Sequence, residues 1–169
     1  MSTDLEVQDW EVGFSAAKPP LKDECTKKGF QLKEAAEAHM NSVSTISGFA
    51  RNIKFDHACQ LFEEAIIQFK LARNWEETAE CYKNCAYLQT IMKKTVHAAI
   101  FYQKAADHFM RCNLYDAIVN YKRCVHWYAH AGKFEIALRY QAKIANMYYL
   151  DDDYDMAAEH YDRAALYCS

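Results

Sequence analysis

Proline and glycine, the residues that most often interrupt helices, are scarce in this chain. The two prolines, Pro19 and Pro20, lie near the N-terminus, and only Gly48 and Gly132 follow residue 29. Long stretches without either residue, rich in Ala, Glu, Lys and Leu, favour helix. Because strand signals are also absent, the sequence predicts an all-α fold.

Three further absences limit the class of protein. No apolar run approaches the roughly 20 residues that span a bilayer. The N-terminal stretch MSTDLEVQDW is acidic and lacks the basic-then-apolar order of a secretion signal. The net charge of −3 excludes a globally basic nucleic-acid-binding protein and leaves only local basic patches. We therefore expect a cytoplasmic protein with no nucleic acid among its partners.

Catalytic motifs are missing as well. The chain has no Gly-rich phosphate loop, no Gly-x-Ser-x-Gly elbow and no His-Glu-x-x-His. We expect neither enzymatic activity nor a bound cofactor.

The cysteines and histidines offer the remaining metal-ligand candidates. The seven cysteines include no Cys-x-x-Cys pair, and we interpret five of them as reduced thiols in the core, namely Cys59, Cys81, Cys85, Cys112 and Cys124. Cys81 and Cys85 lie one helical turn apart, as do His126 and His130, which is a spacing that permits a shared metal. Since neither pair has further ligands at matching spacing, we favour core packing for the cysteines and a helix-end position for the histidines.

A repeat runs through the chain from residue 55. Amphipathic segments such as ACQLFEEA, AIFYQKAA and AAEHYDRAA share an alanine, an aromatic residue three or four positions later, and a small residue one turn beyond. Short connectors separate them at residues 73–75, 93–95, 112–115, 131–134 and 151–154. Two helices in about 40 residues are the signature of a tetratricopeptide-like solenoid of helical hairpins. We expect a flexible tail over residues 1–21 and a solenoid of about seven helices over residues 22–169, with the acidic run 151–153 capping the last helix.

Four basic residues stand near predicted helix ends. Arg73 and Arg111 end helices that are one hairpin apart, so we expect them on the same edge of the stack. Lys133 lies in the following GKF turn and Arg139 lies about a turn and a half beyond it. Each residue alone is explained by the helix dipole. Together, as what we call the basic track, they suit an extended acidic partner.

The stretch NSVSTISGFARN, residues 41–52, is a connector with an unusual apolar content. It separates the helical segments FQLKEAAEAHM and FDHACQLFEEAIIQFK, yet it places Val43, Ile46 and Phe49 at three-residue spacing. Packing against the first hairpin is one explanation of these side chains.

Several segments resemble the soluble NSF attachment proteins, in particular the alpha type. The resemblance runs from about residue 30 to the end, and its most specific segments are FKLARNW, AGKFEIA and AAEHYDRAALY. It implies an adaptor in vesicle trafficking that binds the assembled four-helix SNARE bundle and recruits the NSF ATPase to disassemble it. It assigns SNARE binding to the basic track, because the family carries basic residues at such positions on its concave face.

The resemblance also assigns membrane contact to Val43, Ile46 and Phe49, since the family has a membrane-contact loop between its first two helices. Here the family's phenylalanine cluster is reduced to Phe49, which still implies peripheral association with membranes. Family members continue with further helices beyond the point where this sequence stops. We therefore expect a fragment, or a short form that binds SNAREs without stimulating NSF. A generic tetratricopeptide-like scaffold for another peptide is the alternative.

Overall fold

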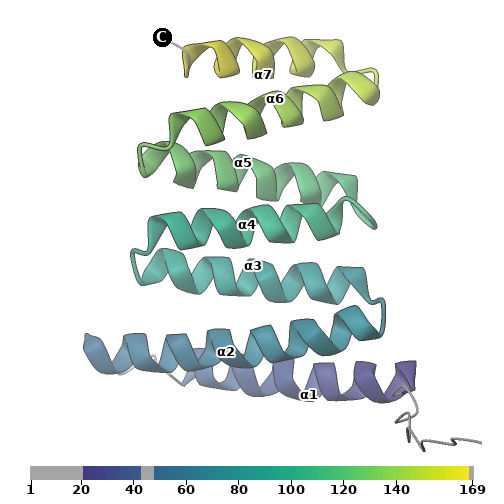
Figure 1. Ribbon diagram of the computed structural model, residues 1–169, viewed down its shortest axis with the longest axis vertical. Helices are drawn as coiled ribbons and strands as arrows, with labels where there is room; N and C mark the ends of the chain where they lie inside the picture. The colour runs from purple at the N-terminus through teal and green to yellow at the C-terminus, as the bar shows by residue number, and fades with distance from the viewer. Residues whose placement is uncertain (1–20, 43–47, 168–169) are drawn as a thin grey trace, which may run out of the picture.

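In the part of the chain that the structure describes, seven α-helices form a stack. This computed structural model describes residues 21–42 and 48–167, and these residues contain no strand. The helices are α1 (Lys22–Asn41), α2 (Phe49–Leu71), α3 (Trp75–Ile91), α4 (Thr95–Phe109), α5 (Leu114–His130), α6 (Phe134–Leu150) and α7 (Tyr154–Leu166) (Figure 1). Each helix packs on its neighbours in sequence, in antiparallel order (Figure 1). The predicted all-α solenoid of helical hairpins is confirmed.

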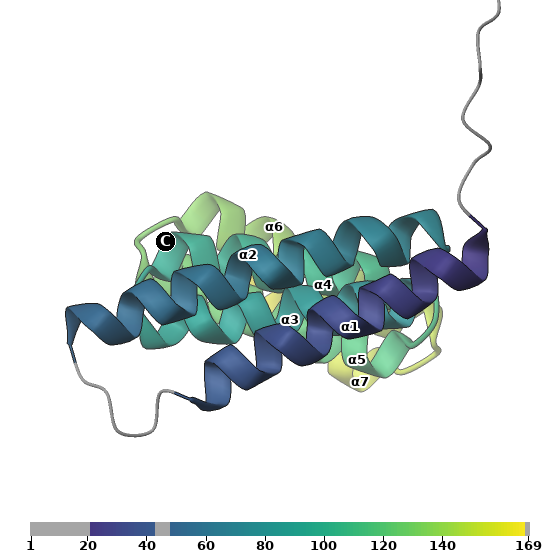
Figure 2. The same cartoon turned by 90° about the horizontal axis from the view of Figure 1, so that it is seen from below.

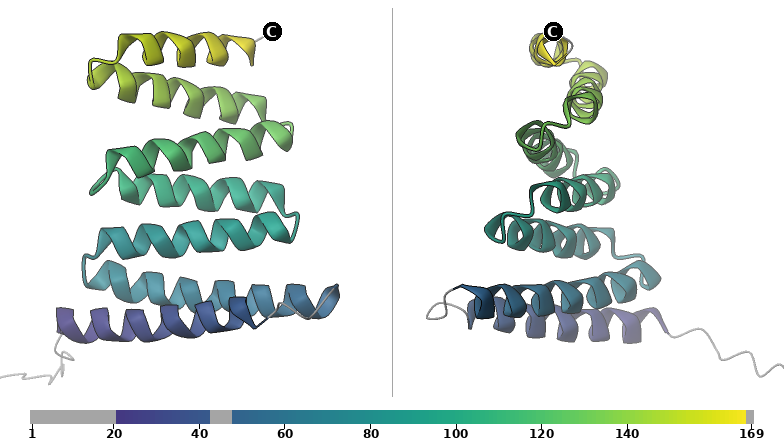
Figure 3. Two further views of the ribbon diagram at one scale, coloured as in Figure 1. Left: turned by 180° about the vertical axis from the view of Figure 1, so that it is seen from behind. Right: turned by 60° about the vertical axis from the view of Figure 1, so that its left-hand side comes forward.

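The helices form two staggered layers that twist along the stack. Seen from the α1 end, α2, α4 and α6 lie on one side, and α1, α3, α5 and α7 lie on the other (Figure 2). In the right-hand view of Figure 3, α1 and α2 are seen from the side, whereas α7 is seen down its axis. Because the helix directions rotate from α1 to α7, turns in successive hairpins point in gradually different directions.

Four of the connections share one tight turn. The α2–α3, α3–α4, α5–α6 and α6–α7 connections each contain a residue with positive φ, which is Arg73 (57°), Lys93 (60°), Gly132 (70°) or Asp152 (59°). In each turn the residue after the one with positive φ donates its backbone N–H to the carbonyl five residues before it. Asn74, for example, donates to the Phe69 carbonyl at 2.9 Å. This pairing satisfies carbonyls at the helix end while the chain reverses direction.

Side chains cap three of the helices that follow turns. Asn74, Asn113 and Asp153 each accept a hydrogen bond from the backbone N–H three residues ahead. These bonds satisfy donors that the first helical turn leaves free. The capping predicted for the acidic run is therefore made by Asp153.

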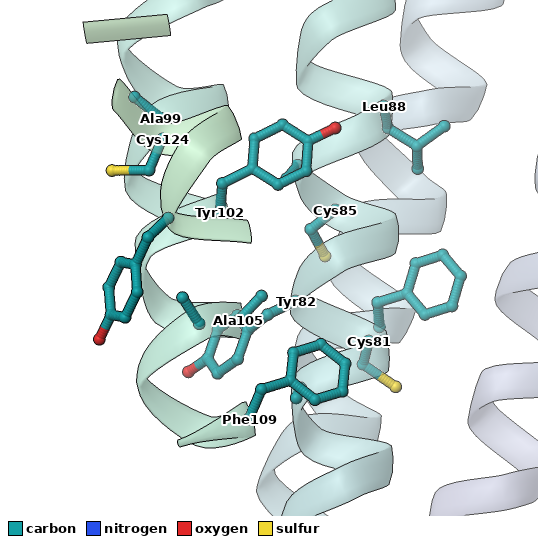
Figure 4. Packing of buried hydrophobic residues seen from close by; sticks show 14 of the residues in the cluster. Cys81, Tyr82, Cys85, Leu88, Ala99, Tyr102, Ala105, Phe109 and Cys124 are labelled. Atoms are coloured by element: carbon teal, nitrogen blue, oxygen red, sulfur yellow. The ribbon is translucent and has the colours of Figure 1, made fainter. Parts of the chain in front are cut away.

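The core combines small residues, aromatic rings and some larger aliphatic side chains. Fully buried alanines such as Ala65, Ala86 and Ala105 allow the helices to approach closely, and Phe62 and Phe69 fill the space between them. Figure 4 shows the same mixture between α3 and α4, where small side chains alternate with large rings.

Helix α1 approaches α2 closely at Gly29. A Cβ atom at this position would lie 2.7 Å from Cε1 of Phe69, a fully buried ring of α2. The ring of Phe30 meets the same Phe69 ring edge-on, with 5.1 Å between centroids. The spacing of the α1–α2 hairpin therefore depends on the missing side chain at Gly29.

Two details of the sequence-based prediction are wrong. The connector predicted to extend to residue 52 ends at Gly48, because no helix breaker follows Gly48 and α2 begins at Phe49. Cys112 is exposed in the four-residue α4–α5 connection rather than buried as a core thiol. Cys59, Cys81, Cys85 and Cys124 are buried, as predicted.

Candidate basic interface

The basic track is divided between the two edges of the stack. Arg73 and Arg111 lie in the α2–α3 and α4–α5 turns, which share one edge, as expected (Figure 1). Lys133 lies in the α5–α6 turn at the opposite edge, and Arg139 lies within α6 between the edges (Figure 1). All four side chains are exposed.

Arg111 is held in place by an aromatic stack. Its guanidinium carbon lies 4.4 Å from the ring centroid of Trp75. The Trp75 ring stacks on His108, with 5.9 Å between centroids, and His108 stacks on Tyr82 at 5.5 Å. We call Trp75, His108 and Tyr82 the aromatic ladder. A guanidinium fixed on an aromatic face loses less freedom on binding than a free side chain.

Arg73 lies beside this ladder. It lines a surface hollow of about 400 Å³ together with Lys22 and Trp75. Because its backbone adopts positive φ, the turn that reverses the chain also sets the place of its side chain.

His108 is the titratable member of the ladder. Burial lowers its pKa below the usual value for histidine, and the nearby charges of Lys70 and Arg111 lower it further. The imidazole is therefore neutral near pH 7 and packs as an aromatic ring between two cations.

Two lysines at the ladder are absent from the sequence-based prediction. Lys70 donates a 2.8 Å hydrogen bond to the Tyr82 hydroxyl and lies 5.1 Å from the centroid of that ring. Lys104 lies 5.7 Å from the same centroid. Both residues belong to the side of the stack that α2 and α4 form (Figure 2). Arg111, Lys70 and Lys104 thus surround one aromatic cluster.

A second basic cluster on α6 repeats this arrangement. Lys143 lies 4.4 Å from the ring centroid of Tyr121 and pairs with Asp107 at 3.1 Å. Tyr121 donates a hydrogen bond to the same carboxylate. Lys143 also lies 5.9 Å from the ring centroid of Tyr140, and Arg139 is close enough to lower the pKa of Tyr140, which burial raises to about 12.

The two clusters are equivalent by repeat. The first residues of α4 and α6, Thr95 and Phe134, are 39 positions apart, as are Lys104 and Lys143. Their aromatic partners, Tyr82 and Tyr121, are also 39 positions apart. The 39-residue recurrence of Lys and Tyr was the sequence signal for this pair, and Asp107 links the clusters because it follows Lys104 on α4 and bonds Lys143 on α6.

Of the three residues predicted for the membrane-contact loop, the structure describes Phe49. Val43 and Ile46 lie outside the described residues. Phe49 is the first residue of α2, and 81% of its surface is exposed. It lies at the edge opposite to Arg73 and Arg111 (Figure 1).

The alternative metal ligands do not gather into a site. Within residues 21–42 and 48–167, no three His, Cys, Asp or Glu side chains are placed to hold a metal ion. His126 and His130 are exposed, with ring centroids 6.5 Å apart. Over the same residues, no helix has the length and the apolar character needed to cross a membrane.

The helical region of the chain matches a known protein family. The sequence profile described as "Soluble NSF attachment protein, SNAP" matches residues 27–169. The chain belongs to this family. The seven described helices of this SNAP-family chain lie within or overlap the matched region.

Individual relatives of this SNAP-family chain support the assignment. The alpha-soluble NSF attachment protein of Homo sapiens is 30% identical over 138 residues, which cover 80% of this chain and 47% of the relative. The beta-soluble NSF attachment protein of Bos taurus is 26% identical over 144 residues, covering 83% of this chain and 48% of the relative. The chain therefore spans about half the length of the curated relatives that it matches.

Proposed function

We propose that this SNAP-family chain is part of an adaptor in vesicle trafficking that binds the assembled four-helix SNARE bundle and recruits the NSF ATPase for its disassembly. The observation that carries the proposal is the family match over residues 27–169. The names of its relatives state attachment to NSF. The tetratricopeptide-like stack provides the framework for binding another protein rather than for catalysis.

The basic clusters provide the chemistry for an acidic helical partner. Arg111, Lys70 and Lys104 surround one aromatic ladder, and exposed Arg139 adds positive charge on α6, where Lys143 is paired with Asp107. Exposed cations of this kind steer an acidic partner and fix its position, and they do so more weakly at high salt. Rings beneath the cations restrict their motion and lower the entropy lost on binding.

Membrane association is the second part of the proposal. We infer that the loop with Val43, Ile46 and Phe49 touches the cytoplasmic face of a membrane and makes the protein a peripheral membrane protein. The 81% exposure of Phe49 supports this role, since an apolar ring of that size is free to enter a lipid surface. Each buried side chain of this type contributes about 1.5–3 kcal/mol, so several copies around one bundle would strengthen a weak contact.

The binding proposal is tested with the double variant Arg111→Glu/Arg139→Glu. We expect it to lose capture of a purified SNARE bundle in a pull-down while its circular dichroism stays unchanged. The matched control is Lys27→Glu/Lys28→Glu on α1, which changes the net charge equally at exposed positions outside the clusters. Capture at the wild-type level by the Arg111/Arg139 variant, or equal loss in the control, would rule out the basic interface.

Recruitment and membrane contact need separate arms. Adding NSF to the captured complex shows whether this half-length chain retains the ATPase, and bundle capture without NSF retention would assign recruitment to other parts of the relatives. For the membrane, Ile46→Ser/Phe49→Ser should reduce co-sedimentation with liposomes and leave bundle capture intact. Equal co-sedimentation of this variant would refute the membrane role of the loop.

A further inference from the structure

A groove lies at the α5–α6–α7 end of the stack, apart from the basic clusters described above. Its volume is about 670 Å³, within the range of ligand-binding pockets. Val125 of α5 and Phe134 of α6 give it apolar walls, and Gln141 of α6 lines it between them. Lys122 and Arg163 place positive charge at its margins.

The preceding repeat shows what normally fills this position. The α3–α4–α5 and α5–α6–α7 units can be aligned in sequence. Helices α4 and α6 begin 39 residues apart, and the N-caps of α5 and α7, Asn113 and Asp153, are 40 residues apart. The corresponding pairs are Lys83 with Lys122, Tyr102 with Gln141, Phe109 with Tyr148, and Arg123 with Arg163.

A cation–ring contact of the first unit recurs in the second. Lys83 lies 5.8 Å from the ring centroid of Phe109, and Lys122 lies 5.2 Å from that of Tyr148. The contact of Tyr102 does not recur: this side chain is only 4% exposed, and the Arg123 guanidinium lies 5.6 Å from its ring centroid. Figure 4 shows the Tyr102 side chain extending from α4 toward α3.

Gln141 stands where Tyr102 would be, and a groove lies there. Gln141 is itself buried, at 4% exposure, and is turned toward His160 of α7. Arg163, the counterpart of Arg123, pairs with Glu159 on its own helix rather than lying over a ring. The second unit thus has cations at the same positions as the first unit, but it has no aromatic side chain at the position of Tyr102.

His160 lines this groove and is hydrogen-bonded to Gln141. It is 1% exposed, and its Nδ1 lies 2.8 Å from the Gln141 amide nitrogen, which donates to it. Its Nε2 therefore carries the proton, yet among the described residues this buried atom has no partner. Burial lowers the pKa of His160, and the charges of Lys122 and Arg163 lower it further, so the ring is neutral near pH 7.

We propose that the groove binds an acidic segment of a partner protein that inserts one aromatic side chain and brings a carboxylate beside it. The aromatic ring takes the place that Tyr102 occupies one repeat earlier. The carboxylate faces Lys122 and Arg163, which line the groove. Phe134 lines the groove, is 51% exposed and stacks on Tyr167 with 6.2 Å between ring centroids, so the groove offers aromatic surface to an inserted ring. The proposal stands on the groove alone and does not depend on SNARE binding.

The test uses the capped peptide acetyl-Ala-Glu-Tyr-Ala-amide, titrated into isotope-labelled protein and followed by NMR at the His160 imidazole. We expect saturable shifts at His160 and at the Gln141 side-chain amide. The peptide with Gln for Glu should bind about tenfold more weakly, since it loses a charge-assisted hydrogen bond. The peptide with Ala for Tyr should lose at least about tenfold, since it loses the buried ring. Equal binding of all three peptides, or shifts that exclude His160, would overturn the proposal.

Two variants of the protein complete the test. Gln141→Tyr restores the Tyr102 side chain of the preceding repeat, so it should fill the groove and abolish binding while the helical spectrum is retained. Arg163→Gln changes an exposed side chain, leaves the groove open and should weaken the Glu peptide about fivefold or more, thereby reducing its advantage over the Gln peptide. If Gln141→Tyr does not fold, Arg163→Gln decides alone. Wild-type affinity in the folded variants, or concentration-dependent His160 shifts without peptide that reveal a second copy in the groove, would refute a partner segment.

Discussion

Replacement of Gly29 by alanine tests how the α1–α2 hairpin is spaced. The added Cβ would lie 2.7, 2.9 and 3.0 Å from three carbons of the Phe69 ring. Alanine favours helix over glycine by about 1 kcal/mol, whereas overpacking of a core costs about 1–3 kcal/mol. Because the Phe69 ring is fully buried and also contacts Phe30, it has little room to move. We expect the upper part of that cost and a net loss of about 1–2 kcal/mol in the free energy of unfolding.

The measurement is urea denaturation followed by far-UV circular dichroism, with a double-mutant cycle. Phe69→Leu alone should cost about 1–2 kcal/mol because it leaves a small cavity. In the double variant the smaller side chain accepts the new methyl group, so the combined loss should fall short of the sum by about 1 kcal/mol or more. A Gly29→Ala protein as stable as the wild type, or strictly additive losses, would show that Gly29 does not set the spacing of the hairpin.

Arg73→Gly should keep or raise stability by up to about 1 kcal/mol, while Arg73→Val should lose about 1–2 kcal/mol in urea denaturation, because the residue has φ of 57°; equal stabilities would refute strain at this turn. Stability should fall as pH drops through the usual histidine pKa of 6.5, because His108 and His160 have lowered pKa values in the folded state and the unfolded chain therefore binds more protons. Urea titrations at several pH values should show a smaller decline for His108→Phe, and an identical decline would contradict the assignment. Iodoacetamide should modify exposed Cys112 before buried Cys81, because burial raises the pKa of Cys81 to about 12. Mass spectrometry measures the order of modification, and faster modification of Cys81 would contradict its burial.

The sequence by itself determined the helices, their repeat and the family. Helix formation depends on local periodicity and on the scarcity of breakers, both of which are written in the chain. The 20-residue alternation of helices and connectors was therefore predictable, as was Asp153 as a cap. The start of α2 at Phe49 was missed because polar residues after Gly48 read as a connector, although nothing there stops a helix.

Only the tertiary structure decided which side chains meet across helices. The partnership of Lys70 and Lys104 with Tyr82, and the place of Lys133 at the edge opposite to Arg111, follow from helix direction and stagger. The groove depends on the same relations, because Gln141 leaves space only where α5 and α7 flank it. Sequence spacing fixes the face of one helix, whereas contacts between helices depend on how the stack twists and packs, and no single segment contains that information.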